Sequence, residues 1–172
     1  ASTYGQSVKN AVDLIQEEVN SSGGINGKNI EFIFEDDQAD PNSAIQAFNK
    51  LVNNDKVVSI LGAVTSGSTL AVAPMATNQK VPLITPTGTE PTITEKGGIY
   101  TFRGCFIDPF QGEILAKYSN ENLKAKTAAV LYNNGSDYSK GIAESFKTDF
   151  EAAGGTVTEF LMKIRETYNR AR

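Results

Sequence analysis

The sequence predicts an α/β protein built on a three-layer, doubly wound and mostly parallel sheet. Segments with helical periodicity alternate with segments typical of strands, and the links between them are short. Residues 57–61 form a mostly β-branched run, a pattern that favours a strand buried on both faces. The 172 residues suffice for one domain, or for one domain and a small part of a second.

The N-terminal part of the chain is expected to form a helix, a strand and a second helix. Apolar residues recur at helical spacing over residues 8–19, and the Ser-Ser-Gly-Gly run at 21–24 is a helix stop signal. Residues 29–35 largely alternate apolar and polar side chains, which predicts a strand. Asp40 and Pro41 predict an N-cap and a first helical residue, because proline lacks the amide hydrogen that would have no partner there.

The middle of the chain is expected to alternate short buried strands with one helix. A strand over 57–61 ends at a glycine, and the polar stretch that follows opens a helix over about 65–78. Pro74 lies inside that helix and is expected to kink it. Two further strands are predicted over 81–84 and 99–103, separated by a loop rich in threonine and proline.

The last part of the chain repeats the same alternation. Asp108 followed by proline predicts a second N-cap, and Gln111 is placed to complete a capping box. A further strand, helix and strand are then expected over 127–132, 136–153 and 156–162. Residues 163–172 are a polar and basic tail.

The composition excludes several classes of function. The chain contains no histidine and a single cysteine, so neither a Ser-His-Asp nor a Cys-His mechanism is available, and a structural zinc site lacks ligands. The net charge of −4 without a basic stripe argues against nucleic acid as a partner. No phosphate-binding glycine motif is present. We therefore expect no enzymatic activity, no metal and no other cofactor, with Cys105 as a packed thiol.

Hydroxyl groups gather where the predicted strands end. In parallel sheets ligands bind outside the carboxyl ends of the strands, here residues 62–68, 85–89 and 133–138. Ser66, Thr87 and Thr89 stand beside glycines, and Ser66 lies near a helix N-terminus, where free amides and the helix dipole favour an anion. Such a pocket can hold a carboxylate without a basic side chain. Helix caps and turns alone would also explain any one of these hydroxyls.

Two tyrosines are further candidates. Tyr4 and Tyr138 are expected on loops that precede helices, where an aromatic ring can line an apolar side chain or stack on a cationic group. From position alone, a half-buried surface tyrosine is the simpler interpretation of each.

Five blocks of sequence, in order, are similar to one known family. They are GGING at 23–27 followed by the acidic pair at 36–37 and Asp40-Pro41; ILG at 60–62 with TSGST at 65–69; LITP at 83–86 with Thr89, Pro91 and Thr94; Arg103, Asp108, Gln111 and Gly112; and YSKG at 138–141. The chain thereby resembles the type I periplasmic or extracellular solute-binding proteins of ABC transporters, in the branched-chain amino acid receptor group typified by Leu/Ile/Val-binding proteins. The similarity covers about residues 1–160.

The resemblance implies a flavodoxin-like lobe of a clamshell that closes on a free amino acid, with a branched-chain amino acid as the expected solute. Ser66, Thr87 and Thr89 would fix the solute's carboxylate and ammonium groups, and Tyr4 and Tyr138 would line its side chain. The implied partners are the amino acid and an ABC permease. The implied location is periplasmic or extracellular after removal of a signal peptide, with a cell-surface anchor in a Gram-positive organism.

The chain also departs from that family, whose members are about twice as long. An apolar first strand that normally lies in the middle of the sheet is missing, as is most of the second lobe, so we expect a truncated or partial chain. The expected domains are residues 1–118 as a first lobe, 119–162 as the start of a second lobe, and 163–172 as a tail of unclear origin. Either residues 156–162 or a second copy, in a strand-swapped homodimer, is expected to fill the gap.

Other functions stay open at this stage. A ligand-sensing regulatory domain of the same fold would share every motif above, although no helix-turn-helix or membrane span is evident. An engineered or truncated scaffold without any ligand would explain the unmatched tail. An enzyme on a similar half-fold is the weakest alternative, because it would need a nucleophile or a phosphate loop.

Overall fold

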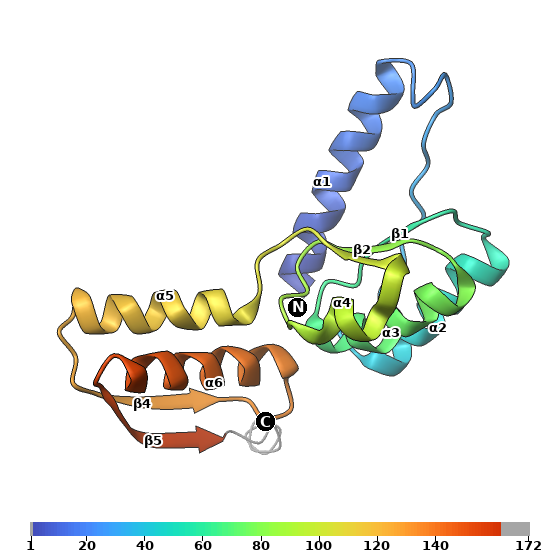
Figure 1. Cartoon of the computed structure of the whole chain (residues 1–172). Coiled ribbons are helices and arrows are strands. Elements are labelled where there is room, and N and C mark those ends of the chain that lie inside the picture. Colours follow the sequence, from blue (N-terminus) through green and yellow to red (C-terminus); the bar gives the residue numbers. More distant parts are fainter. Residues whose placement is uncertain (1, 163–172) are drawn as a thin grey trace, which may run out of the picture.

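The computed structural model describes residues 2–162, which form two parallel sheets with helices packed against them (Figure 1). The first sheet has the strand order β1 (Ile60–Leu61), β2 (Leu83–Thr85) and β3 (Thr101–Arg103), and the second pairs β4 (Thr127–Tyr132) with β5 (Thr156–Met162). The α-helices are α1 (Ser2–Ser21), α2 (Pro41–Asn49), α3 (Ser66–Gln79), α4 (Thr92–Gly97), α5 (Asp108–Glu121) and α6 (Asp137–Ala152). A π-helical turn, Lys50–Asn54, extends α2, and a 3-10 turn, Gly98–Tyr100, precedes β3. The predicted mixture of helices and parallel sheet is confirmed, although β1 to β3 are shorter than expected.

Helices α2 and α3 cover one face of the first sheet. The core between them consists of five buried apolar side chains, Ala44, Phe48, Val72, Ala76 and Leu83. The Thr101 hydroxyl in β3 donates a hydrogen bond to the Ala73 carbonyl of α3, which fixes that helix along the sheet. Burial of these apolar groups is the main stabilising contribution to this half of the molecule.

The opposite face of the first sheet remains exposed. Leu61, Ile84 and Phe102 are direct partners in the parallel register, so they share one face, and each is at least two-fifths exposed. Their neighbours Leu83, Thr85 and Thr101 point the other way and are buried. The helix layer expected on this second face is not seen among residues 2–162.

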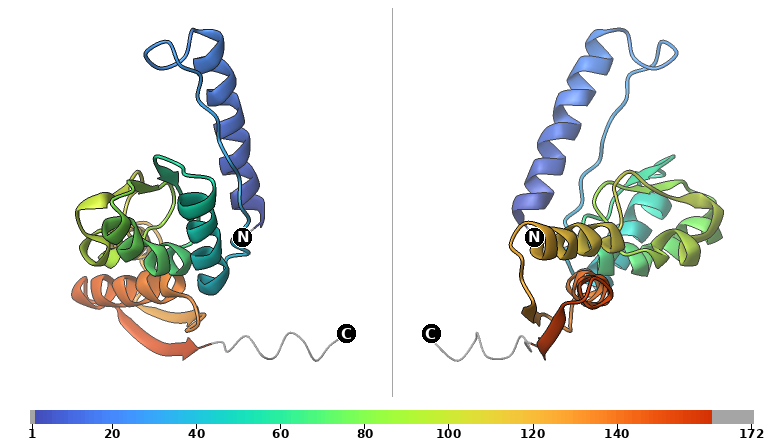
Figure 2. Two further views of the ribbon diagram at one scale, coloured as in Figure 1. Left: turned by 90° about the vertical axis from the view of Figure 1, so that its right-hand side faces the viewer. Right: turned by 60° about the vertical axis from the view of Figure 1, so that its left-hand side comes forward.

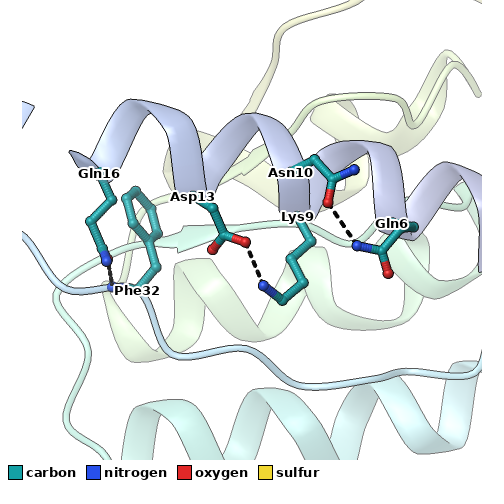
Figure 3. A network of polar contacts seen from close by, with 6 residues as sticks. All are labelled: Gln6, Lys9, Asn10, Asp13, Gln16 and Phe32. Atoms are coloured by element: carbon teal, nitrogen blue, oxygen red, sulfur yellow. Dashed lines mark hydrogen bonds and ion pairs between the residues drawn. The ribbon is translucent and has the colours of Figure 1, made fainter. Parts of the chain in front are cut away.

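The first helix and the segment after it extend away from both sheets as an arm, here residues 2–36 (Figures 1 and 2). Residues 29–35 were expected to form a strand, and this prediction is wrong, since no described strand pairs with them. Side-chain amides of α1 form some of the backbone hydrogen bonds that a neighbouring strand would otherwise provide. The Asn20 side chain accepts from the amide of Ile30 and donates to its carbonyl, at 2.8 Å each. Gln16 accepts from the Phe32 amide at 2.7 Å (Figure 3).

The second sheet packs beneath a helix pair. Helices α5 and α6 pack along each other, and Phe150 of α6 is fully buried. Strand β5 pairs with β4 in parallel from Thr127↔Thr156 to Tyr132↔Met162. The expectation that residues 156–162 would fill a gap in the first sheet is therefore wrong, because these residues belong to the second sheet. The predicted domain boundary at 118 falls inside α5 and stays a prediction, and the tail at 163–172 lies outside the described residues.

Of the two predicted N-caps, Asp40 is confirmed and Asp108 is wrong. The Asp40 side chain accepts a hydrogen bond from the Ser43 amide with Pro41 at the first helical position, as predicted, and Ser136 caps α6 through the Ser139 amide. Asp108 was expected to be the N-cap of α5 in a capping box with Gln111, and this is wrong. Ile107 occupies the cap position, and Asp108 is the first helical residue with a fully buried side chain.

The core of the first sheet can be tested by truncating Phe48, which is 2% exposed between α2 and α3. We expect Phe48→Ala to lower the free energy of unfolding by about 3–5 kcal/mol, because it removes buried apolar surface and leaves a cavity. Urea denaturation followed by circular dichroism measures the change. The matched control Val58→Ala removes a fully exposed side chain and should change the stability by less than about 0.5 kcal/mol. Equal losses in both variants would contradict this placement of the core.

Candidate functional site

Two loops at the carboxyl edge of the first sheet are joined by threonine hydroxyls. Thr85, the last residue of β2, is fully buried, and its hydroxyl donates to the Ala63 carbonyl at 2.9 Å and accepts from the Gly88 amide at 2.9 Å. Thr69 of α3 reaches the same Ala63 carbonyl at 3.1 Å. The loops after β1 and β2 are thereby held in one arrangement, because buried hydroxyls are costly to leave without partners.

Glycine is required at position 88. A Cβ atom there would lie 2.7 Å from the Thr85 hydroxyl, which is closer than real Cβ contacts allow, and 3.0 Å from Ile93 Cδ1, which is a tight contact. The missing side chain lets the loop after β2 turn tightly over the end of its own strand. As a result, Thr87 and Thr89 stand on either side of this turn.

Thr87 and Thr89 are held differently. The Thr87 side chain is exposed, and its hydroxyl donates to the Val64 carbonyl at 2.6 Å. Thr89 is buried, and its carbonyl accepts from Arg103 Nη1 at 3.2 Å and from the Asp108 amide at 2.9 Å. Arg103 also reaches the Pro91 carbonyl at 3.0 Å, so one guanidinium fixes the whole loop.

Ser66 is buried and is the first residue of α3, as expected from the sequence. Thr65 takes the N-cap position without a side-chain cap bond, so the first amides of this 14-residue helix have no capping side chain. The helix dipole adds a partial positive charge at the same end. These features would favour a small anion beside Ser66, and this role of Ser66 stays a prediction.

The two candidate tyrosines lie inside helices, so the expectation that both would lie on loops before helices is wrong. Tyr4 is in the first turn of α1 and is 69% exposed, and Tyr138 is in the first turn of α6 and is 45% exposed. Burial of the ring raises the pKa of the Tyr138 hydroxyl, and the nearby Asp108 and Tyr4 raise it further.

Several buried polar atoms around this edge have no hydrogen-bond partner among residues 2–162. They are the hydroxyls of Thr65, Ser68 and Thr89, both carboxyl oxygens of Asp108, and Nε2 of Gln111. Such atoms are rare in folded proteins, because a buried group without a partner costs about 1–3 kcal/mol. Their concentration between α3, α5 and the loop after β2 marks this region as one suited to a polar ligand.

Asp108 is the site residue whose role sequence reasoning missed. Its carboxyl is fully buried, and a Cβ atom added at Gly141 of α6 would lie 2.6 Å from its Oδ2 atom. Burial raises the pKa of this carboxyl, and the charge of Glu90 adds to the effect, while the charge of Arg103 opposes it. The sequence offered two signals, Asp-Pro at a helix start and a place in one of the five family blocks, and neither predicts burial of the carboxyl.

Residues 2–162 show no support for a reactive thiol, a metal site or a membrane-spanning helix. Cys105 is half-buried, and burial raises the pKa of its thiol, so the unreactive protonated form is favoured. Within residues 2–162 no group of three or more acidic, cysteine or histidine side chains is placed to hold a metal ion. No described helix is both long and apolar enough to cross a membrane. The five predicted site residues, Tyr4, Ser66, Thr87, Thr89 and Tyr138, stay predictions as ligand contacts.

Comparison with known proteins identifies similar sequences. A profile of a family described as periplasmic binding protein matches residues 1–167. The chain is 36% identical to the Leu/Ile/Val-binding protein BraC3 of Rhizobium johnstonii over 153 residues, covering 89% of this chain and 41% of that protein. It is also 36% identical to a leucine-, isoleucine-, valine-, threonine- and alanine-binding protein of Pseudomonas aeruginosa, covering 91% of this chain and 42% of that one.

Solved structures agree with the sequence comparison. The substrate-binding protein LivJ of Streptococcus pneumoniae, in complex with isoleucine, superposes with a TM-score of 0.86 at 38% identity, covering 95% of this chain and 46% of that one. The leucine-binding protein LivK of Thermotoga maritima gives a TM-score of 0.88 at 32% identity, covering 96% of this chain and 46% of that one. The chain thus spans about 40% of the length of the curated relatives it matches.

Burial of the Asp108 carboxyl predicts a specific dependence of the protein's stability on pH. Because folding raises the pKa of the Asp108 carboxyl, the native state favours its protonated form. The stability gained from this protonated form is complete below the pKa of the unfolded state, 3.8, and is lost as the pH rises through the pKa of the folded state. We expect Asp108→Asn, which stays neutral, to gain stability relative to the parent protein as the pH is raised from about 4 to 7.

Thermal unfolding of both proteins across this pH range measures the difference. The control is Asp13→Asn, which changes a half-exposed carboxyl on α1 and should leave the pH dependence nearly unchanged. A difference between Asp108→Asn and the parent that is constant with pH would show that this carboxyl does not titrate with a raised pKa.

Proposed function

The chain belongs to the periplasmic binding protein family, and from this premise we propose that it is part of the solute-binding component of an ABC importer. The proposed solute is a free amino acid, with the branched-chain amino acids leucine, isoleucine and valine foremost. The observation that carries the proposal is the cluster of hydroxyls and free amides at the start of α3 and in the loop after β2, which suits the carboxylate of an amino acid.

The proposed roles follow from the chemistry of each group. Ser66 and the first amides of α3 receive the carboxylate, because both supply hydrogen-bond donors where the helix dipole favours negative charge. The hydroxyls of Thr87 and Thr89 and the carbonyls around them offer acceptors for the ammonium group. No full charge is needed on the protein for either contact.

The tyrosines form the apolar side of the proposed site. Tyr4 from α1 and Tyr138 from α6 present rings that can line an aliphatic side chain. Tyr138 approaches from the second sheet, so a solute between these groups would touch both halves of the molecule. This arrangement supports the proposal that two lobes close around the solute.

The proposed protein makes and breaks no bond. It presents the solute to an ABC permease, and its location is periplasmic or extracellular, with a cell-surface anchor in a Gram-positive organism. The hydroxyl groups and free helix amides of the described site support a binding role.

Isothermal titration calorimetry with leucine, isoleucine and valine tests the proposal. We expect saturable binding to the 172-residue chain, weaker than about 10 μM, because the chain spans less than half the length of the relatives and part of the cleft lies outside it. Ser66→Ala should weaken this binding at least tenfold by removing one donor to the carboxylate.

The matched control is Ser21→Ala, at the far end of α1, which should bind as the parent protein does. Glutamate and lysine serve as solute controls and should bind more weakly. An absence of heat with every branched-chain amino acid, or equal binding by Ser66→Ala, would contradict the proposed solute or the proposed site.

A further inference from the structure

The Asp108 carboxyl is enclosed, without a hydrogen-bond partner, at the junction between the two sheets. Its side chain is fully buried, and neither carboxyl oxygen bonds another described residue. A Cβ atom at Gly141 would lie 2.6 Å from Oδ2 and 3.2 Å from Cγ of this carboxyl, so the backbone of α6 lies directly against it. The Thr89 hydroxyl and Nε2 of Gln111 are likewise buried without a described partner. The carboxyl is therefore cut off from water but not paired.

An ionised carboxylate does not fit these surroundings. Burial of a charge costs far more than burial of a neutral polar group unless hydrogen bonds compensate for the lost water. The guanidinium of Arg103 does not compensate here, because its Nη1 and Nη2 atoms donate to the carbonyls of Thr89 and Pro91. The arrangement thus matches the protonated acid, and ionisation of Asp108 would require water or new donors at its two oxygens.

Four ionisable groups are coupled electrostatically to this carboxyl. Burial raises the pKa of Asp108, the charge of Glu90 in the loop after β2 raises it further, and the charge of Arg103 in β3 opposes both. The carboxyl in turn raises the pKa of Cys105, ahead of α5, and of Tyr138 on α6. Helix α3 contains no ionisable side chain. Asp108 is therefore expected to change its charge at a higher pH than an ordinary aspartate does.

Helices α5 and α6 are packed too closely to move independently. A Cβ atom at Gly112 of α5 would lie 2.5 Å from Ser145 Cβ and 2.6 Å from the Phe146 amide nitrogen, both on α6. The Ser145 hydroxyl also donates to the Pro109 carbonyl at 3.1 Å. The two helices are therefore expected to move as one pair, which carries Tyr138 with it.

The helix pair meets the first sheet and its loops at two places. The Asp108 amide donates to the Thr89 carbonyl at 2.9 Å. At the start of α3, a Cβ atom at Gly67 would lie 3.5 Å from Oδ2 of Asp137, the first residue of α6. Residues 105–107 are the short connection between β3 and α5. Water can thus reach the Asp108 carboxyl if the pair turns about this connection and leaves the loop after β2.

We propose that Asp108 is a positioning residue whose protonated carboxyl lets α6 and its Tyr138 lie against the loop of Thr89, and whose ionisation separates the two halves. The carboxyl gives its proton to solvent water as the junction opens. Because it is enclosed, it acts through the position of α6 and not by contact with a solute. Resting on the proposed function, the consequence is that a solute held between Thr89 and Tyr138 binds more tightly at low pH.

The distance between the two halves is the first test and requires no solute. Gln79→Cys at the end of α3 and Thr148→Cys on α6 provide exposed positions for a fluorescent donor and acceptor, with Cys105→Ala in the same chain. We expect energy transfer to fall as the pH is raised from about 4.5 to about 7.5, because the carboxyl ionises and the helix pair moves away. A transfer efficiency that stays constant over this range would overturn the proposal.

Variants of the labelled chain identify the group that titrates. Asp108→Asn cannot ionise and should keep the halves together at every pH. Glu90→Gln removes a charge that raises the pKa of Asp108, so it should move the midpoint of the transition to lower pH. The matched control Glu144→Gln removes an exposed charge from α6 and should keep the parent midpoint.

Two results with these variants would contradict the assigned role. A transition that persists in Asp108→Asn would show that another group drives the movement. Equal midpoints for Glu90→Gln and Glu144→Gln would show that the titrating group is not the one that Glu90 influences. The second comparison keeps the Asp108 carboxyl in place, so it decides the question even where Asp108→Asn does not fold.

Calorimetry with leucine then tests the consequence for the solute. Binding to the parent chain should be at least about fivefold weaker at a pH of about 7.5 than at about 4.5, and Asp108→Asn should lose much less affinity over the same range. An equal loss in both proteins would overturn the effect on the solute. An absence of heat at every pH would contradict the proposed function alone, because the distance measurements decide the role of Asp108 without any solute.

Discussion

The buried hydroxyl of Thr85 is the interaction on which the candidate site depends. It joins the carbonyl of Ala63, after β1, to the amide of Gly88, after β2, at the edge where the parallel strands end. Parallel pairing brings these loops to one side of the sheet, but pairing alone does not fix their shape. Because water cannot replace a partner at a fully buried hydroxyl, any other loop arrangement would leave polar atoms unsatisfied. Ser66, Thr87 and Thr89 are therefore positioned by hydrogen bonds that need no ligand.

Much of this arrangement was predictable from the sequence, because it depends on local signals. Alternating periodicities predicted the described α-helices other than α4, and all five described strands, and Asp40-Pro41 predicted a helix start. The hydroxyl-rich turns gave the edge of the sheet at which the candidate residues lie. The failures share one cause, which is that tertiary context decided them. Residues 29–35 have the pattern of a strand, yet a strand exists only where another pairs with it. Asp108 has the sequence of a cap, yet the approach of Gly141 on α6 encloses its carboxyl. No pattern within a few residues contains that information.

The junction between the two sheets runs through Asp108. Asp108 starts α5, which packs along α6, while its amide bonds the Thr89 carbonyl in the loop after β2. The same residue thus contacts both halves of the molecule, one through its backbone and the other through its buried carboxyl. A movement of α6 relative to the first sheet would change the surroundings of that carboxyl and of Tyr138 together. The candidate site and the junction are consequently one continuous structure.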